Sequence, residues 1–361
     1  MNGIHRISLD CLSANCYIAP KTEMVFISNP VTHAMREIAP SIYQVRLPLP
    51  FALKIVNCYL IRDQHTWTVI DTGLNIPEAR QVWIDTFGLL NIKPEQLERI
   101  ILTHYHPDHY GLAGWLQEWC REQGAPVPPV YMSERDRYLA REIFRPDGNQ
   151  LEVLELFFRR CGVPDALAAT LTTDIQHLHG LIRPQPEPVL TLQPGECIEI
   201  GPYHFEILHT PGHSDGHLMF WDREQRLVLC GDHILLHITP NISLWPTTEP
   251  DPLGRYLASL DSLARLPVEV ALPGHGPTIS DWFARLSELK SHHRDRLDQM
   301  LGCINSHTSV YQVCTQVFET DNLSYHEIRF AITETLAHLD YLVRIGEIIL
   351  SENGCWLYSK R

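Results

Sequence analysis

Short apolar runs and turn residues alternate along the chain from residue 42 onwards. The runs are rich in β-branched and aromatic residues and are bounded by turn residues, which is typical of strands. The stretch 77–90 carries a proline in its first turn, a position that favours the start of a helix. The predicted strands are 42–47, 56–61, 67–70, 99–103, 130–132, 189–192, 197–200, 204–208, 217–221, 226–230 and 268–272. The predicted helices of this part are 77–90, 111–122, 252–266 and 281–302.

Strands and helices recur in two successive halves, with histidine and aspartate residues at strand ends. This order predicts a layered α/β domain over residues 39–282, with its functional site along one edge of the sheets. Residues 133–182 are mainly helical without a metal-type cluster, so we interpret them as an insertion that can cap the site. Residues 1–38 show no sustained period. Either these residues are an N-terminal extension, or the natural protein starts at Met35.

Residues 283–361 continue the last long helix into a small module. Residues 310–318 and 325–345 predict two helices. Two short strands then flank Asn353-Gly354, a strong hairpin signal. The order helix, helix, hairpin is that of a winged helix.

The strongest chemical signal is His104-x-His106-x-Asp108-His109, directly after a buried strand. Imidazole and carboxylate groups are ligands that suit zinc, iron and manganese. In a sharp turn, His104 and His106 can point at one ion, and Asp108 and His109 at a neighbouring one. Four such residues within six positions favour a metal site over a solvated histidine-rich loop.

Three further residues, His213, Asp232 and His275, each follow a glycine at the end of a predicted strand. Taken singly, a histidine or aspartate at a strand end is more often a capping residue. Together the three repeat one arrangement, in which a rigid strand delivers a ligand to a single edge. Asp71 also ends a strand, before a turn glycine.

These motifs together resemble those of the metallo-β-lactamase superfamily, over about residues 42–282. The resemblance implies a four-layer αββα sandwich with a dinuclear metal site. It assigns His104, His106 and His213 to the first metal ion, and Asp232 to a bridging position. It assigns to the second metal ion Asp108, His109 and His275.

The resemblance also implies a mechanism. A water molecule bound between two ions has a pKa lowered towards ~7 and becomes a usable hydroxide. Asp108 is the candidate catalytic residue, since it could accept or relay a proton. Asp71 would orient a ligand histidine, or it is a plain turn carboxylate. Redox di-iron members carry a carboxylate where this chain has His106, which favours hydrolysis over oxygen reduction. We expect two divalent metal ions as cofactors, zinc first, with iron or manganese as alternatives.

The stretch 335–347 resembles the winged-helix tail of the LACTB2-like branch, some members of which cleave single-stranded RNA. Residues 306–361, however, hold four Lys and Arg against seven Asp and Glu, a net charge of 4 − 7 = −3. A module that reads nucleic acid is expected to be basic. We therefore interpret this module as a packing or dimerisation element, which would allow a homodimer.

Charge, cysteine pattern and the lengths of the apolar runs argue against several classes of protein. The formal net charge of −14 argues against broad binding to nucleic acids or anionic membranes. The ten cysteines form no C-x-x-C pair, which is typical of reduced thiols in a cytoplasmic protein. No apolar run approaches the ~20 residues of a membrane span, and the N-terminus lacks a secretory pattern.

The function we predict is hydrolysis of a small ester, thioester or lactone. The alternative is a phosphodiesterase or single-strand endoribonuclease of the same superfamily, which a basic groove leading to the metals would support. A third reading is a metal-stabilised scaffold without catalytic activity. The complete ligand set argues against it, because structural zinc sites are usually closed and tetrahedral.

Overall fold

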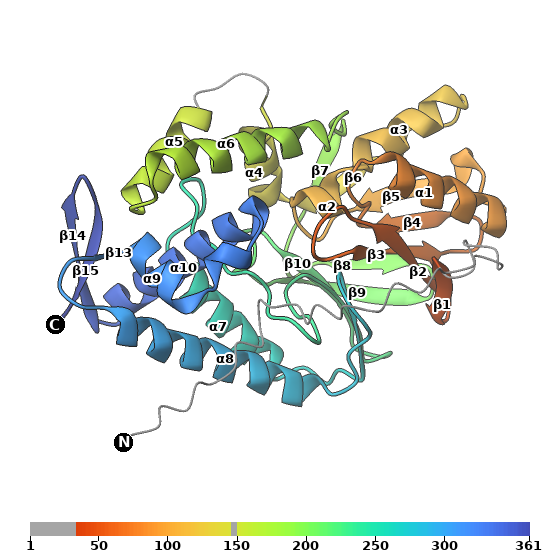
Figure 1. Cartoon of the computed structure of the whole chain (residues 1–361). Coiled ribbons are helices and arrows are strands. Elements are labelled where there is room, and N and C mark those ends of the chain that lie inside the picture. The colour runs from red at the N-terminus through yellow and green to blue at the C-terminus, as the bar shows by residue number, and fades with distance from the viewer. Residues whose placement is uncertain (1–33, 146–149) are drawn as a thin grey trace, which may run out of the picture.

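The computed structural model describes residues 34–145 and 150–361, and two β-sheets form its centre (Figure 1). The first sheet has seven strands that neighbour one another in chain order. Pairing is antiparallel from β1 to β4 and parallel from β4 to β7. The strands are β1 (Met35–Ala39), β2 (Ile42–Pro48), β3 (Ile55–Arg62), β4 (Trp67–Ile70), β5 (Leu97–Ile101), β6 (Val130–Ser133) and β7 (Val189–Leu192).

The second sheet has five strands in the order β12-β11-β10-β9-β8. Its strands pair antiparallel except β11 and β12, which are parallel. Side chains such as Ile61 and Tyr59 of the first sheet and Phe205 and Phe220 of the second form one shared core between the sheets. The strands are β8 (Cys197–Ile200), β9 (Tyr203–His209), β10 (Leu218–Asp222), β11 (Leu227–Gly231) and β12 (Val270–Pro273).

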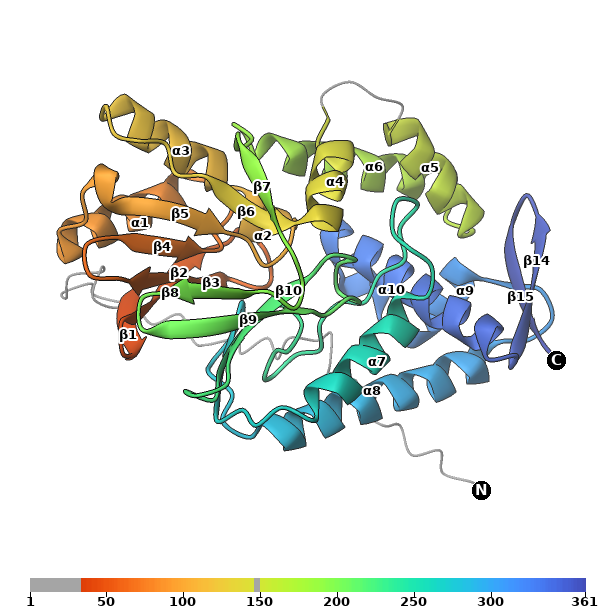
Figure 2. The ribbon, with the colours of Figure 1, turned by 180° about the vertical axis from the view of Figure 1, so that it is seen from behind.

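Helices cover the outer face of each sheet, as the two opposite views show (Figures 1 and 2). Trp83 and Leu116 bury one helical layer against the first sheet. Tyr256 and Trp282 bury another against the second. The four layers confirm the predicted αββα fold. The layer helices are α1 (Pro77–Leu90), α3 (Ala113–Glu122), α7 (Pro252–Leu263) and α8 (Trp282–Cys303), with the short α2 (Pro107–Tyr110) and η2 (Pro94–Gln96) between strands.

The insertion and the C-terminal module pack against each other. Phe158 and Leu171 of the insertion share one core with Val313 and Leu339 of the module. The insertion therefore packs against the C-terminal module as well as against the main domain. The elements are α4 (Glu134–Ile143), α5 (Gln150–Arg160), α6 (Asp165–Gly180), β13 (Thr308–Ser309), α9 (Val310–Val317), η3 (Thr320–Asn322), α10 (Tyr325–Arg344), β14 (Ile348–Asn353) and β15 (Cys355–Lys360).

Several element boundaries differ from the sequence-based expectations. Met35–Ala39 forms β1 and pairs with β2, although most of it was assigned to the N-terminal extension. Its apolar pattern is too short to predict a strand before the pairing partner is known. The rest of that extension, residues 1–33, lies outside the described residues. The expected helix 111–122 is α3 and begins two residues later, at Ala113, and the separate short helix α2 precedes it at Pro107–Tyr110.

Candidate metal centre

Five strands end at the same edge of the sandwich, and each delivers one polar residue to it. Asp71 follows β4 directly, and Asp232 follows β11. His104, His213 and His275 come two to four residues after β5, β9 and β12. The short helix α2 then begins at Pro107 with His106 as its N-cap residue. A strand end therefore positions each part of the predicted site, as the sequence pattern indicated.

The first group of side chains consists of His104, His106 and His213. Each offers a nitrogen atom, and these atoms lie within 4.8 Å of one another. His106 Nδ1 lies 2.8 Å from His213 Nε2. The His104 ring centroid lies 4.7 Å from that of His106 and 5.0 Å from that of His213. Three imidazoles thus converge on one point.

The second group consists of Asp108, His109, Asp232 and His275, again with ligand atoms within 4.8 Å of one another. His275 Nε2 lies 3.2 Å from Asp108 Oδ2 and 3.4 Å from Asp232 Oδ2. Asp232 also reaches the first group, since its Oδ2 lies 3.6 Å from His213 Nε2. The structure therefore brings all seven predicted ligands together, with Asp232 between the two groups.

The other nitrogen of four histidines is held by a neighbour. His104 Nδ1 lies 2.9 Å from Thr103 Oγ1, and His109 Nδ1 lies 2.8 Å from a carboxylate oxygen of Asp71. His213 and His275 each present Nδ1 to a backbone carbonyl, at 2.9 and 2.7 Å. These contacts fix the ring orientation and favour the tautomer whose Nε2 is free to bind a cation.

Asp71 occupies a left-handed backbone conformation, with φ of 58°. Its Oδ1 accepts a hydrogen bond from the Thr103 backbone N–H, and its Oδ2 accepts one from the Thr103 hydroxyl, each at 2.8 Å. These bonds hold the Asp71 carboxylate in place, and its contact to His109 in turn orients a member of the second group. The contact expected between Asp71 and a ligand histidine is present.

Several buried atoms of the site have no hydrogen-bond partner among the described residues. They are Nε2 of His104, His109 and His275 and Oδ1 of Asp232. Burial lowers the pKa of His275, but Asp232 and Asp108 more than offset this and raise it to about 10. The carboxylates thus attract positive charge to buried, unpaired donor atoms. Because unpaired buried polar atoms are costly, the residues present fit bound cations.

Gly274, between β12 and His275, leaves no room for a side chain. A Cβ atom there would collide with Asp232 Oδ1 and lie 2.7 Å from His109 Cε1. The glycine therefore allows the β12 end to approach the shared carboxylate closely, which explains the glycine before this histidine.

Three histidines near the site have different roles. His217 is fully buried, and its Nε2 accepts a hydrogen bond of 3.2 Å from the Asp232 backbone N–H. His233 is buried beside the Tyr256 ring, and His237 is exposed. Of these three, His217 is therefore the one that positions a predicted ligand directly. A small pocket at the first group is lined in part by Tyr105.

The C-terminal module contributes to the same region, which the sequence did not reveal. The backbone carbonyl of Asn241 holds His213, and its Nδ2 donates a 3.0 Å hydrogen bond to Glu334 Oε2 on α10. Glu334 is 5% exposed, and Phe330, one turn before it, lines the pocket at the first group. The sequence signal that could have indicated this contact was a glutamate within the apolar stretch of α10.

Asp136 on α4 connects the insertion to both metal-motif loops. Ser133 caps α4, since its Oγ accepts a hydrogen bond from the Asp136 backbone N–H at 3.1 Å. The Asp136 carboxylate accepts from the backbone N–H groups of Tyr105 and Gly216 and from the hydroxyl of Ser214, at 3.1, 2.7 and 2.7 Å. The insertion thereby fixes the loops that carry His104 and His213.

We expect Asp136 to make stability depend on pH. Burial raises its pKa from 3.8 to about 7, although three hydrogen bonds lower it. Between about pH 4 and 7 the folded chain thus keeps a proton that the unfolded chain releases. The free energy of unfolding, relative to an Asp136→Asn variant, should fall by about 1.4 kcal/mol per pH unit as pH rises through this window. Urea unfolding of both proteins at several pH values measures it, and a constant difference would contradict it.

Comparison with known proteins agrees with this fold. Residues 52–275 match the metallo-beta-lactamase superfamily, and residues 297–361 match the metallo-beta-lactamase-like C-terminal domain. The chain therefore belongs to the metallo-beta-lactamase superfamily and is a metallo-hydrolase. None of the helices in the described ranges is long and apolar enough to cross a membrane.

Three similar proteins cover most of the chain. A metallo-beta-lactamase family protein from Thermus thermophilus is 31% identical, with a TM-score of 0.80 over 90% of this chain and 100% of that one. The probable metallo-hydrolase YqjP of Bacillus subtilis is 26% identical over 88% of this chain and 96% of its own length. The atrochrysone carboxyl ACP thioesterase of Aspergillus chevalieri is 22% identical over 75% and 68%.

Proposed function

We propose that the protein hydrolyses a small ester, thioester or lactone with the help of two divalent metal ions. The observation that carries the proposal is the convergence of seven side chains in two groups around Asp232, with ligating atoms that lack partners within the described part of the chain. Imidazole and carboxylate donors suit zinc, and also iron or manganese. We expect zinc.

The residues would divide the work as follows. His104, His106 and His213 would hold one ion, and Asp108, His109 and His275 the other, with Asp232 shared. Bound ions would supply hydroxide at neutral pH by lowering the pKa of coordinated water towards ~7. Asp108 is the most exposed member of the second group, with 20% of its side chain accessible. Solvent therefore reaches its carboxylate more than the other members of this group, and we assign it to accept or relay the proton.

Charge favours an acyl substrate over RNA. The chain has a formal net charge of −14. A basic surface would be needed to hold a polynucleotide. The thioesterase among the similar proteins supports the same substrate class. We infer that the C-terminal module is a winged-helix-like packing element, because its order of helix, helix and hairpin matches that motif and α10 packs on α6 and α8. A homodimer and a cytoplasmic location remain predictions.

A substrate panel on metal-loaded full-length protein tests the proposal. Esters, thioesters and lactones should be hydrolysed, while phosphodiesters and single-stranded RNA should not. Asp108→Ala should lower kcat/KM about 10²–10⁴-fold, the usual contribution of a proton-transfer group together with any loss of metal. Asp261→Ala, which replaces an exposed aspartate on α7, is the control and should be without effect. Cleavage of RNA with no acyl hydrolysis would favour the phosphodiesterase alternative instead.

A further inference from the structure

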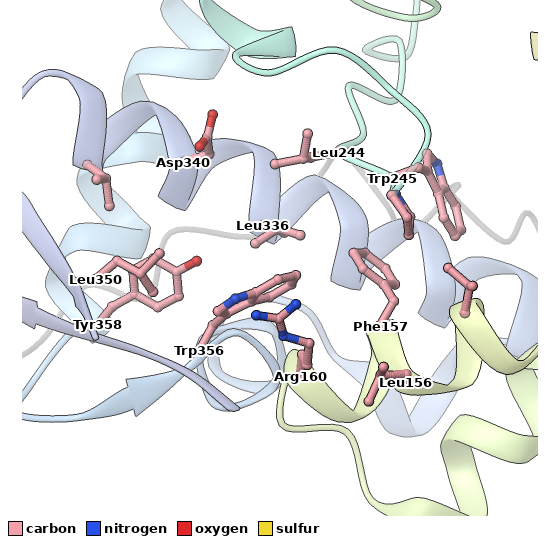
Figure 3. Close-up of a pocket in the computed structure, with 13 residues that line it drawn as sticks. Leu156, Phe157, Arg160, Leu244, Trp245, Leu336, Asp340, Leu350, Trp356 and Tyr358 are labelled. Carbon is pink, nitrogen blue, oxygen red and sulfur yellow. The ribbon is translucent and has the colours of Figure 1, made fainter. Parts of the chain in front are cut away.

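A cavity of about 440 Å³ lies between the insertion, the loop 244–246 and the C-terminal module (Figure 3). This volume falls within the usual range for small-molecule sites, roughly 300–1,000 Å³. The cavity is elongated: Trp245 stands at one end and Leu350 and Tyr358 at the other. Its shape suits an extended ligand.

The walls are mostly apolar and come from three separate parts of the chain. Phe157 and Leu156 project from α5, Leu336 from α10, and Leu350 and Trp356 from the β14–β15 hairpin. Leu156 is 59% exposed and Leu350 is 43% exposed. Exposed apolar side chains gathered around one cavity are typical of a binding site.

The charged side chains that line the cavity, among the described residues, are already paired. Arg160 lies 2.9 Å from Glu352 and stacks over the Trp356 ring at 4.7 Å. Asp340 accepts hydrogen bonds from Arg344 at 2.7 and 3.2 Å. Neither charge is free to recognise a phosphate or an ammonium group, so the cavity favours an uncharged apolar ligand.

Trp245 joins this cavity to the metal centre. It lines the cavity, and it also lines the small pocket that contains His106 and His213. Its ring stacks on Phe157 at a centroid distance of 6.0 Å. Its backbone N–H donates a 2.9 Å hydrogen bond to Thr248 Oγ1. The cavity and the small pocket therefore adjoin at the Trp245 side chain.

We propose that the cavity holds the apolar acyl chain of the substrate while the scissile carbonyl group lies at the metal centre. This inference rests on the proposed ester or thioester hydrolysis and adds a linear acyl chain as the substrate class. Specificity for chain length then comes from the insertion and the C-terminal module together, because each supplies part of the wall.

A series of p-nitrophenyl esters and acyl thioesters, from acetyl to decanoyl, tests the inference on metal-loaded full-length protein. For the wild-type protein, kcat/KM should rise about two- to fourfold per added methylene until the cavity is full. Leu156→Trp places a larger ring in the cavity at an exposed position that folding tolerates. It should lower kcat/KM for decanoyl substrates at least about 10-fold and leave acetyl substrates within about twofold.

The matched control is Leu89→Trp, which makes the same change at a 45% exposed leucine on α1, outside the cavity. Calorimetric titration with decanoate adds a readout that needs no activity, since the wild-type protein and the control should bind and Leu156→Trp should not. A flat chain-length profile, or equal behaviour of both variants, would overturn the inference while hydrolysis of acetyl substrates upholds the proposed function. No acyl hydrolysis at all, with decanoate binding that Leu156→Trp abolishes, would reject the function and keep the apolar site.

Discussion

Asp232→Ala should reduce the metal content from two ions per chain to one or fewer and lower hydrolysis at least about 10³-fold. Asp232 is the side chain that approaches both groups, at 3.6 Å from His213 and 3.4 Å from His275. Its removal takes a negative charge from both sites at once. The loss should be large because bound ions lower the pKa of water from 15.7 to about 7. Metal analysis and steady-state kinetics on the same preparations measure both effects.

The matched control is Asp222→Ala, which removes another buried aspartate, 1% exposed, at the end of β10. Asp222 accepts hydrogen bonds from the backbone N–H groups of His204 and Gln225, at 2.8 and 2.9 Å. This variant should lose stability but keep two ions when folded. An Asp232→Ala protein with two ions and near-normal turnover would contradict the assignment.

Asp71→Asn should weaken metal binding or activity about 10–100-fold, as loss of a residue that orients a ligand histidine usually does. The amide keeps the size of Asp71 but offers only one acceptor oxygen. It can no longer accept from Thr103 and His109 as the carboxylate does. The His109 tautomer whose Nε2 is free to bind a cation is then less favoured. Competition with a chelator measures the affinity of the folded protein for metal.

Asp251→Asn is the control for backbone strain, because Asp251 has φ of 60° against 58° for Asp71. Asparagine tolerates this left-handed conformation. Both variants should therefore fold, and only Asp71→Asn should lose metal. Equal chelator resistance of the two proteins would show that Asp71 is an ordinary turn residue.

Local sequence signals predicted a layered α/β domain with its site at one edge, and the resemblance to the metallo-β-lactamase superfamily implied the sandwich and the seven converging ligands. Apolar runs marked the strands, and glycine turns with His213, Asp232 and His275 marked their ends. The resemblance then implied that these strand-end residues converge on one site. The strand β5 still begins two residues earlier than expected, since Leu97 and Glu98 carry no strong strand signal.

The remaining contacts could not be predicted because they join distant segments. Asp136 lies in the first turn of α4, yet its carboxylate accepts hydrogen bonds from Ser214 and Gly216, 78 and 80 residues away. Glu334 lies 93 residues from Asn241. No periodicity or turn signal encodes such pairs, since they depend on how the insertion and the module dock. The apolar cavity arises from the same docking.

The link from α10 through Asn241 to His213 has a consequence for recombining parts of this protein. Ser243 and Thr333 also share a hydrogen bond of 2.8 Å, and the Leu244 N–H donates to the Thr333 carbonyl at 3.1 Å. A chimera that keeps the sandwich but takes its tail from a relative would leave the 241–244 loop without its anchor. Transplanted tails therefore have to bring compatible side chains at the α10 face, and the natural unit of exchange includes both parts.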